Sequence, residues 1–131
     1  MKNAAWTTIR SNDTRALIDF LCEAFGFEEQ FVVLTDDGRK IQHAQLVWPL
    51  GGGVMLGDTG IHDSDLEQPL GGAAVYLVTE NPGELYKRAV KAKAKNLRKP
   101  ENQNYGSRDF AANNLGGNVW SFRTYSGEGS Y

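Results

Sequence analysis

Apolar positions in the first half of the chain change from the spacing of a strand to that of a helix and back again. Residues Ala4 to Ile9 are rich in β-forming side chains and predict a strand. From Ala16 to Phe25 the apolar side chains recur at helical spacing, with candidate N-caps at Ser11 to Asp13 and a stop at Gly26. The first half therefore has the order β-α-β-β-β, its later strands being predicted at Phe27 to Leu34, Ile41 to Trp48 and Val54 to Leu56.

The same order returns after an acidic, turn-rich segment. Asn81, Pro82 and Glu84 predict a helix start, with a cap, a proline at the first position and a glutamate at the third. A shift of 68 residues aligns Asp13 with Asn81, which indicates an internal repeat; two unrelated α+β units of similar rhythm are the alternative. The strands of this half are predicted at Ala73 to Thr79, Leu97 to Lys99, Arg108 to Ala112 and Asn118 to Tyr125.

Length and composition favour one α+β domain. The chain has 131 residues, enough for a single core, and an ordinary globular composition. We expect module one at about 1–57, a linker at about 58–71, module two at about 72–125 and a frayed tail at 126–131. Both modules together are predicted to make the single domain.

Charge and apolar content disfavour two classes of partner. The net charge of −2 gives no global reason to bind nucleic acid, and no apolar run is long enough to cross a bilayer. The basic series from Lys87 to Lys99 is interpreted as a solvated helix face, with a polyanion site as the alternative.

The single Cys22 and an N-terminal stretch without the apolar core of a signal peptide predict a cytoplasmic protein.

Two C-terminal motifs carry a family resemblance. Tyr105-Gly106-Ser107-Arg108-Asp109-Phe110 and Gly117-Asn118-Val119-Trp120-Ser121-Phe122 resemble the closing strands of bacterial glyoxalase/bleomycin-resistance-like domains, in the vicinal-oxygen-chelate superfamily. Ala24-Phe25-Gly26-Phe27 and His43-Ala44-Gln45-Leu46 resemble the first helix and the third strand of that family. The resemblance implies two β-α-β-β-β modules whose curled mixed sheets surround a cavity, and a homodimer.

Metal-using members of this superfamily place histidine, glutamate or glutamine ligands on the first and last strand of each module. The corresponding positions here are Trp6, Ala74, Ser121, and Met55 or Leu56, none of which suits a divalent cation. The resemblance therefore implies a chain without the superfamily's metal, and we expect no cofactor. His62-Asp63-Ser64-Asp65 is the best local alternative cluster, although such residues in an acidic loop are usually solvated.

Strand alternation, anchored on these positions, predicts which side chains face the cavity. Trp6 and Tyr76 supply flat apolar walls, and Trp120 and Phe122 face the helices. The predicted ligand-binding residues are Trp6, Thr8, His43, Gln45, Tyr76, Tyr105, Arg108 and Ser121.

Each of these residues has a structural alternative. His43, the best catalytic candidate, is equally explained as a hydrogen-bonded structural histidine. Arg108 can hold a turn through Glu101 or Asp109, and Tyr105 can cap the sheet edge. Trp6 can instead belong to a dimer interface.

The favoured function is metal-free binding of an aromatic or amphipathic small molecule, sequestered in the cavity of a homodimer. The first alternative is a lyase, isomerase or dioxygenase-like enzyme, metal-dependent or metal-free, with His43 as its general base. A regulatory or scaffolding domain with a vestigial cavity is the second. The sequence shows no nucleophile-base-acid set, phosphate loop or carboxylate pair that would specify a reaction.

Overall fold

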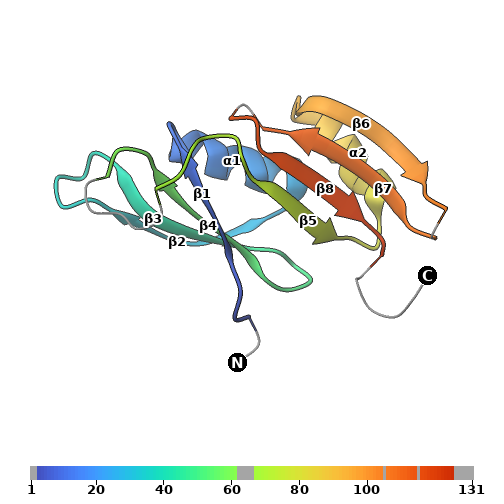
Figure 1. The fold of residues 1–131 in the computed structure, drawn as a ribbon, viewed down its shortest axis with the longest axis horizontal. Coiled ribbons are helices and arrows are strands. Elements are labelled where there is room, and N and C mark those ends of the chain that lie inside the picture. Colours follow the sequence, from blue (N-terminus) through green and yellow to red (C-terminus); the bar gives the residue numbers. More distant parts are fainter. Residues whose placement is uncertain (1–2, 62–66, 105, 115, 126–131) are drawn as a thin grey trace.

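The predicted order β-α-β-β-β occurs twice in the structure, a computed structural model that describes residues 3–61, 67–104, 106–114 and 116–125 (Figure 1). Module one consists of β1 Thr7–Ser11, α1 Thr14–Phe25, β2 Glu28–Leu34, β3 Ile41–Val47 and β4 Gly53–Asp58. Module two consists of β5 Ala74–Val78, α2 Pro82–Lys91, β6 Lys95–Asn102, β7 Arg108–Asn113 and β8 Val119–Arg123. The predicted tail at 126–131, the loop cluster His62 to Asp65 and the predicted site residue Tyr105 lie outside the described residues.

Each module forms its own four-stranded mixed sheet with the same topology. The strand orders are β1-β4-β3-β2 and β5-β8-β7-β6, and in both sheets the first strand runs parallel to the last. The remaining neighbours pair antiparallel. This identity of strand order confirms the internal repeat and the predicted α+β fold class.

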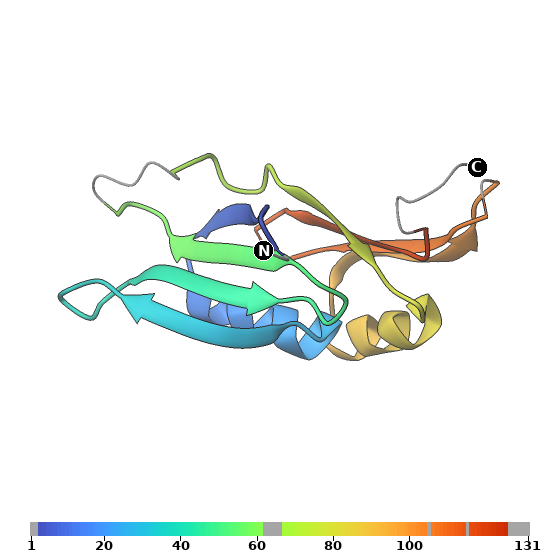
Figure 2. The same ribbon diagram turned by 90° about the horizontal axis from the view of Figure 1, so that it is seen from below.

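Both helices cover the same side of the two sheets (Figure 2), and the core lies between these layers. Alternate residues of the strands point into it, among them Ile9, Leu56, Phe110, Trp120 and Phe122, all nearly inaccessible to solvent. The prediction that Trp120 and Phe122 pack beneath the helices is thus confirmed. The opposite side of each sheet carries no helix, and we call these two sides the open faces.

Both helix starts have the caps that the sequence predicts. Asp13 Oδ1 accepts a hydrogen bond of 3.1 Å from the backbone N–H of Ala16, and Asn81 Oδ1 accepts one of 3.3 Å from that of Glu84. Helix α1 ends at Gly26 with a positive φ of 85°, a conformation that glycine adopts without a steric penalty.

Strand β6 extends into a segment that the sequence predicts as a turn. The sequence predicts a strand that ends at Lys99 and a turn from Pro100, whereas β6 continues through Pro100 to Asn102. The proline is tolerated because β6 is an edge strand, and its register against β7 shifts between Arg98 and Glu101. The missing N–H therefore breaks no ladder in the middle of a sheet.

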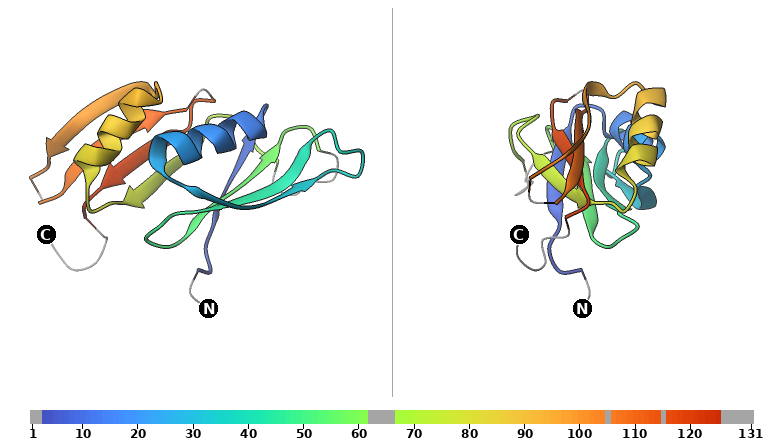
Figure 3. Two further views of the ribbon diagram at one scale, coloured as in Figure 1. Left: turned by 180° about the vertical axis from the view of Figure 1, so that it is seen from behind. Right: turned by 90° about the vertical axis from the view of Figure 1, so that its right-hand side faces the viewer.

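The expectation of strongly curled sheets around a cavity is wrong for the single chain. The sheets twist but stay open (Figure 3), because four strands are too few to close on themselves. The open faces of the described chain therefore do not enclose a ligand by themselves.

Candidate functional site

The open face of module one carries four of the predicted ligand-binding residues. Thr8 of β1 and Gln45 of β3 both pair with Met55 of β4, so these three side chains share this face. His43 lies two residues before Gln45 in β3 and therefore on the same face. The half-buried Trp6 precedes β1 and lies beside Gly53. Trp6 Nε1 donates a 3.2 Å hydrogen bond to the carbonyl oxygen of Asn3.

The outer strand of this face presents exposed apolar side chains. A register shift in β2 places Phe31 opposite Gln45 and Val33 opposite His43, and these apolar side chains are 42% and 47% exposed. The rings of Phe31 and His43 lie 5.8 Å apart with an interplanar angle of 37°. Module one thus offers an apolar surface with two polar side chains, His43 and Gln45, set within it.

The open face of module two carries Tyr76 and Ser121, which are paired on β5 and β8. Tyr76 is 46% exposed, and its hydroxyl donates a 2.6 Å hydrogen bond to the carbonyl oxygen of Tyr125. Arg123 lies over the Tyr76 ring at 5.4 Å from the ring centroid. These residues combine an exposed aromatic ring with polar groups on one face.

A buried carboxylate organises the polar part of this face. Asp109 is only 7% exposed and pairs with Arg123 through an Nη1–Oδ2 distance of 3.0 Å. Arg123 Nε donates a 2.7 Å hydrogen bond to Ser121 Oγ, and the hydroxyl of Ser107 donates to Asp109 Oδ1. Sequence reasoning missed this network, because the pairing of Asp109 with Arg123 follows from the register of β7 against β8.

A hollow of about 380 Å³ adjoins this network. It is bounded by β6, β7 and β8, with Ser121, Arg123 and Asp109 from the network and Arg98, Lys99 and Glu101 from β6. The volume suits a fragment-sized group. Both signs of charge line the hollow, which favours a polar part of a ligand over a purely apolar one.

Arg108 lies apart from this network. It shares its face of β7 with Phe110 and Ala112 rather than with Asp109, and its exposed guanidinium donates a 3.0 Å hydrogen bond from Nη1 to Asn102 Oδ1. The structure thus brings Tyr76 and Ser121 together on one sheet, and Trp6, Thr8, His43 and Gln45 on the other.

The donors at the superfamily's metal positions do not fit a divalent cation. Of the two candidates on β4, Met55 faces the open side, whereas Leu56 is buried beneath the helices. Trp6, Ala74, Met55 and Ser121 offer indole, methyl, thioether and hydroxyl groups, with no carboxylate or imidazole. Within the described residues, no group of three histidine, cysteine, aspartate or glutamate side chains is placed to hold a metal ion.

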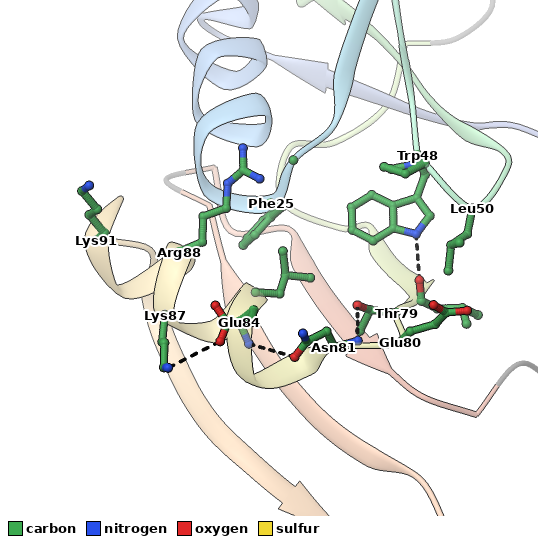
Figure 4. A pocket seen from close by; sticks show the side chains of 14 residues that line it. Phe25, Trp48, Leu50, Thr79, Glu80, Asn81, Glu84, Lys87, Arg88 and Lys91 are labelled. Carbon is green, nitrogen blue, oxygen red and sulfur yellow. Dashed lines mark hydrogen bonds and ion pairs between the residues drawn. The ribbon is translucent and has the colours of Figure 1, made fainter.

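A second hollow, of about 680 Å³, lies between the modules on the helix side (Figure 4). Phe25, Trp48 and Leu50 form its apolar part, and Arg88 and Lys91 lie toward one end. Hydrogen bonds from Trp48 and Arg88 tie the modules together here. Trp48 Nε1 donates to the carbonyl oxygen of Val78 at 2.8 Å, and Arg88 Nε donates to that of Glu23 at 2.8 Å.

Comparisons with solved structures show the same fold. TioX from Micromonospora sp. ML1 is 23% identical, with 92% of this chain and 98% of that chain covered and a TM-score of 0.72. A glyoxalase/bleomycin resistance protein from Streptomyces sp. CB03234 is 20% identical over 92% of this chain and 98% of that one, with a TM-score of 0.66. A mutant of the fosfomycin resistance protein FosX from Listeria monocytogenes, complexed with Mn(II) and 1S,2S-dihydroxypropylphosphonic acid, is 11% identical over 96% and 94%, with a TM-score of 0.65.

Two further searches, of the curated proteins and of the helices for a membrane span, add nothing to the assignment of the family. The search of curated proteins gave no match. Neither helix of the described residues has the length and apolar character needed to span a membrane. The family model for the Glyoxalase/Bleomycin resistance protein/Dioxygenase superfamily, however, matches residues 3–122, and the chain therefore belongs to this superfamily.

Proposed function

We propose that this chain binds an aromatic or amphipathic small molecule on its open faces, enclosed between two copies of the chain and without the superfamily's metal. The observation that carries the proposal is the set of exposed apolar side chains on these faces. Phe31, Val33 and Tyr76 stay exposed although each sheet already has a complete core on its other side. Phe31 and Val33 lie together on the open face of module one, and an exposed apolar patch usually marks a binding site.

Enclosure by a second copy follows from the shape of the sheets. A bound molecule on an open face of one chain would keep much of its apolar surface in water, whereas ligand sites usually bury most of the ligand. A second open face placed over the first would supply the missing wall. Trp6, just before β1, and Phe31 on the outer strand β2 would then lie at the rim of the interface.

Binding is favoured over catalysis by the surroundings of His43. The imidazole lies beside the Phe31 ring in a tilted arrangement, and among the described residues no hydrogen-bond partner fixes its orientation. A general base is ordinarily held by such a partner, and no nucleophile lies within hydrogen-bonding distance of this ring among the described side chains. The resistance proteins among the similar structures support a small-molecule ligand, since their names refer to the antibiotics fosfomycin and bleomycin.

Thermal unfolding of the metal-stripped protein tests the proposal. A panel of aromatic and amphipathic molecules, with bleomycin among them, should contain a compound that raises the melting temperature saturably, by several degrees at about 100-fold excess over its Kd. Trp6→Ala and Tyr76→Ala should weaken this shift. Val90→Ala is the control and should leave the shift unchanged, because it removes an exposed apolar group from α2, on the side of the sheet opposite the open face.

Two results would contradict metal-free binding. One is a saturable stabilisation by a single divalent cation with no response to any organic compound. The other is turnover of a compound that depends on His43, lost in His43→Ala and kept in Trp6→Ala. Sedimentation of wild type and Phe31→Glu checks the dimer separately, because a charge on this face should shift the population toward monomer.

A further inference from the structure

A third hollow lies at the other end of the junction between the modules, away from the predicted ligand-binding residues. It has a volume of about 300 Å³ and lies between the β1–α1 corner of module one and the β7–β8 hairpin of module two. Leu17 and Phe20 of α1 and Leu70 of the linker provide its apolar side, and Asn114 and Asn118 of the hairpin its polar side. None of the predicted ligand-binding residues lines it.

The two asparagines are buried but only half satisfied. Asn114 is 7% and Asn118 is 3% exposed. Asn114 Oδ1 accepts a 2.9 Å hydrogen bond from Trp120 Nε1, and Asn118 Oδ1 accepts one of 3.2 Å from the backbone N–H of Ala73. Each of these bonds fixes which end of the amide carries the nitrogen. Neither Nδ2 donates to an acceptor among the described residues, and neither is enclosed, because Thr14 Oγ1 is the one fully buried side-chain polar atom of these residues without a partner. Both Nδ2 groups therefore reach solvent, although the rest of each side chain is buried.

Both amide nitrogens lie on the side of the hollow. A Cβ atom placed on Gly116, which lines the hollow, would lie 3.1 Å from Asn114 Nδ2 and 3.9 Å from Asn118 Nδ2. Two hydrogen-bond donors from the hairpin therefore converge near Gly116, opposite the leucine and phenylalanine side chains of α1. A pair of convergent donors beside an apolar wall suits a carbonyl oxygen attached to an apolar body.

The hollow in Figure 4 is the counterpart of this one in the internal repeat, and the two differ in how their hydrogen-bond donors are used. The shift of 68 residues that aligns the modules places Leu17 on Leu85 and Phe20 on Arg88, which line the Figure 4 hollow. There the protein satisfies its own donors, because Trp48 Nε1 and Arg88 donate to backbone carbonyls. In the hollow near Gly116 the Nδ2 donors of Asn114 and Asn118 instead reach solvent and are open to an acceptor on a bound molecule.

From this geometry we propose a second small-molecule site, formed by Leu17, Phe20, Leu70, Asn114 and Asn118, that binds a neutral aromatic or aliphatic carbonyl compound. The carbonyl oxygen accepts hydrogen bonds from the two Nδ2 groups, and the apolar body packs against Leu17 and Phe20. A neutral ligand is favoured because Arg10 and Asp13, which also line the hollow, carry opposite formal charges. This site is separate from the open-face site, so either can exist without the other.

Benzamide is the probe and benzylamine the control, because the second has the same ring but carries a protonated amine in place of the neutral amide with its acceptor oxygen. In two-dimensional ¹H–¹⁵N spectra of the full chain, benzamide should shift the side-chain NH₂ signals of Asn114 and Asn118 and the backbone signal of Gly116 saturably. Benzylamine should shift none of them. Asn118→Asp keeps the acceptor for Ala73 and removes the donor, and should weaken benzamide binding about tenfold or more.

Two further variants test the proposal if Asn118→Asp disturbs folding. Gly116→Val fills the space beside both amides and should also abolish the shifts. Tyr76→Ala, on the open face, should leave the benzamide affinity within about twofold of wild type. The proposal is overturned if benzamide gives no saturable shift at the hairpin, if benzylamine shifts the same signals, or if only the Tyr76→Ala variant loses binding.

Discussion

Two glycines of β4 lie where a side chain would collide with the backbone of β3. A Cβ atom on Gly53 would overlap the carbonyl oxygen of Leu46 and come within 2.9 Å of the Trp6 ring. A Cβ on Gly57 would overlap the Arg10 guanidinium and lie 2.7 Å from the carbonyl oxygen of Gln42. Glycine at these positions thus allows β1, β3 and β4 to approach closely, and it makes room for Trp6 on the open face.

We expect Gly53→Ala to lower the free energy of unfolding by about 1–3 kcal/mol, since the backbone of Leu46 must move to accept the methyl group. Urea unfolding followed by circular dichroism measures the change. Gly83→Ala is the control, because a Cβ there meets only Asn81 Oδ1, at an ordinary contact distance of 4.0 Å, and alanine favours the helix that contains it. An equal loss in both variants would show that close packing is not the cause.

The thiol of Cys22 gives a prediction about pH. Burial raises its pKa, and the nearby Glu29 carboxylate raises it further, because both disfavour the thiolate. Since the thiolate is the nucleophile, alkylation by iodoacetamide at pH 8 should be slower than that of glutathione, and its rate should still increase at a pH where glutathione has reached its plateau. Glu29→Gln should lower the pH at which the alkylation rate of Cys22 is half-maximal. If wild-type Cys22 reached its half-maximal rate at or below the pH at which glutathione does, the expected shift would be contradicted.

At the scale of elements, Asp58 links α1, β3 and β4. Its Oδ1 accepts a 3.0 Å hydrogen bond from the backbone N–H of Thr14 at the start of α1, and its Oδ2 accepts one of 2.7 Å from that of Ile41 at the start of β3. Asp58 is the last residue of β4. One carboxylate thus positions the helix and two strands of module one.

Asp58→Ala should therefore lower the free energy of unfolding by roughly 2–4 kcal/mol, because two buried N–H groups lose a charged acceptor. Asp58→Asn retains one acceptor oxygen and should lose about half as much. Asp36→Ala, in the exposed β2–β3 turn, is the control and should change stability by no more than about 0.5 kcal/mol. If Asp36→Ala were as damaging as Asp58→Ala, general loss of negative charge would explain both.

The elements themselves could be predicted from local chemistry, whereas the contacts between them could not. Asp13, Gly26 and Asn81 mark helix ends by short-range rules, and the structure confirms all three. Asp58 looks like a linker residue because its partners are 17 and 44 positions away. Pairing of Asp109 with Arg123, and the two amides near Gly116, likewise depend on register and packing that a single sequence does not display.

At the scale of the whole molecule, the two modules share one core. Phe25 of α1 contacts Phe122 of β8, with ring centroids 4.6 Å apart, and Trp48 lies between Phe27 at 5.0 Å and Phe122 at 6.0 Å. Arg88 of α2 donates hydrogen bonds to the carbonyl oxygens of Cys22 and Glu23, near the end of α1. Neither module could bury these aromatic rings alone, so the repeat is not a pair of independent domains.

The shared core predicts one cooperative unfolding transition, with coincident curves by tryptophan fluorescence and far-ultraviolet circular dichroism. Trp48→Phe keeps a ring between Phe27 and Phe122 but removes the N–H that bonds Val78, and should cost about 1 kcal/mol without splitting the transition. Trp6→Phe is the matched control, because its N–H bonds an exposed carbonyl and its loss should cost less than about 0.5 kcal/mol. Since Trp48 joins the modules and Trp6 does not, a split transition in the Trp48 variant would mean that this one contact, rather than the aromatic core, couples the two halves.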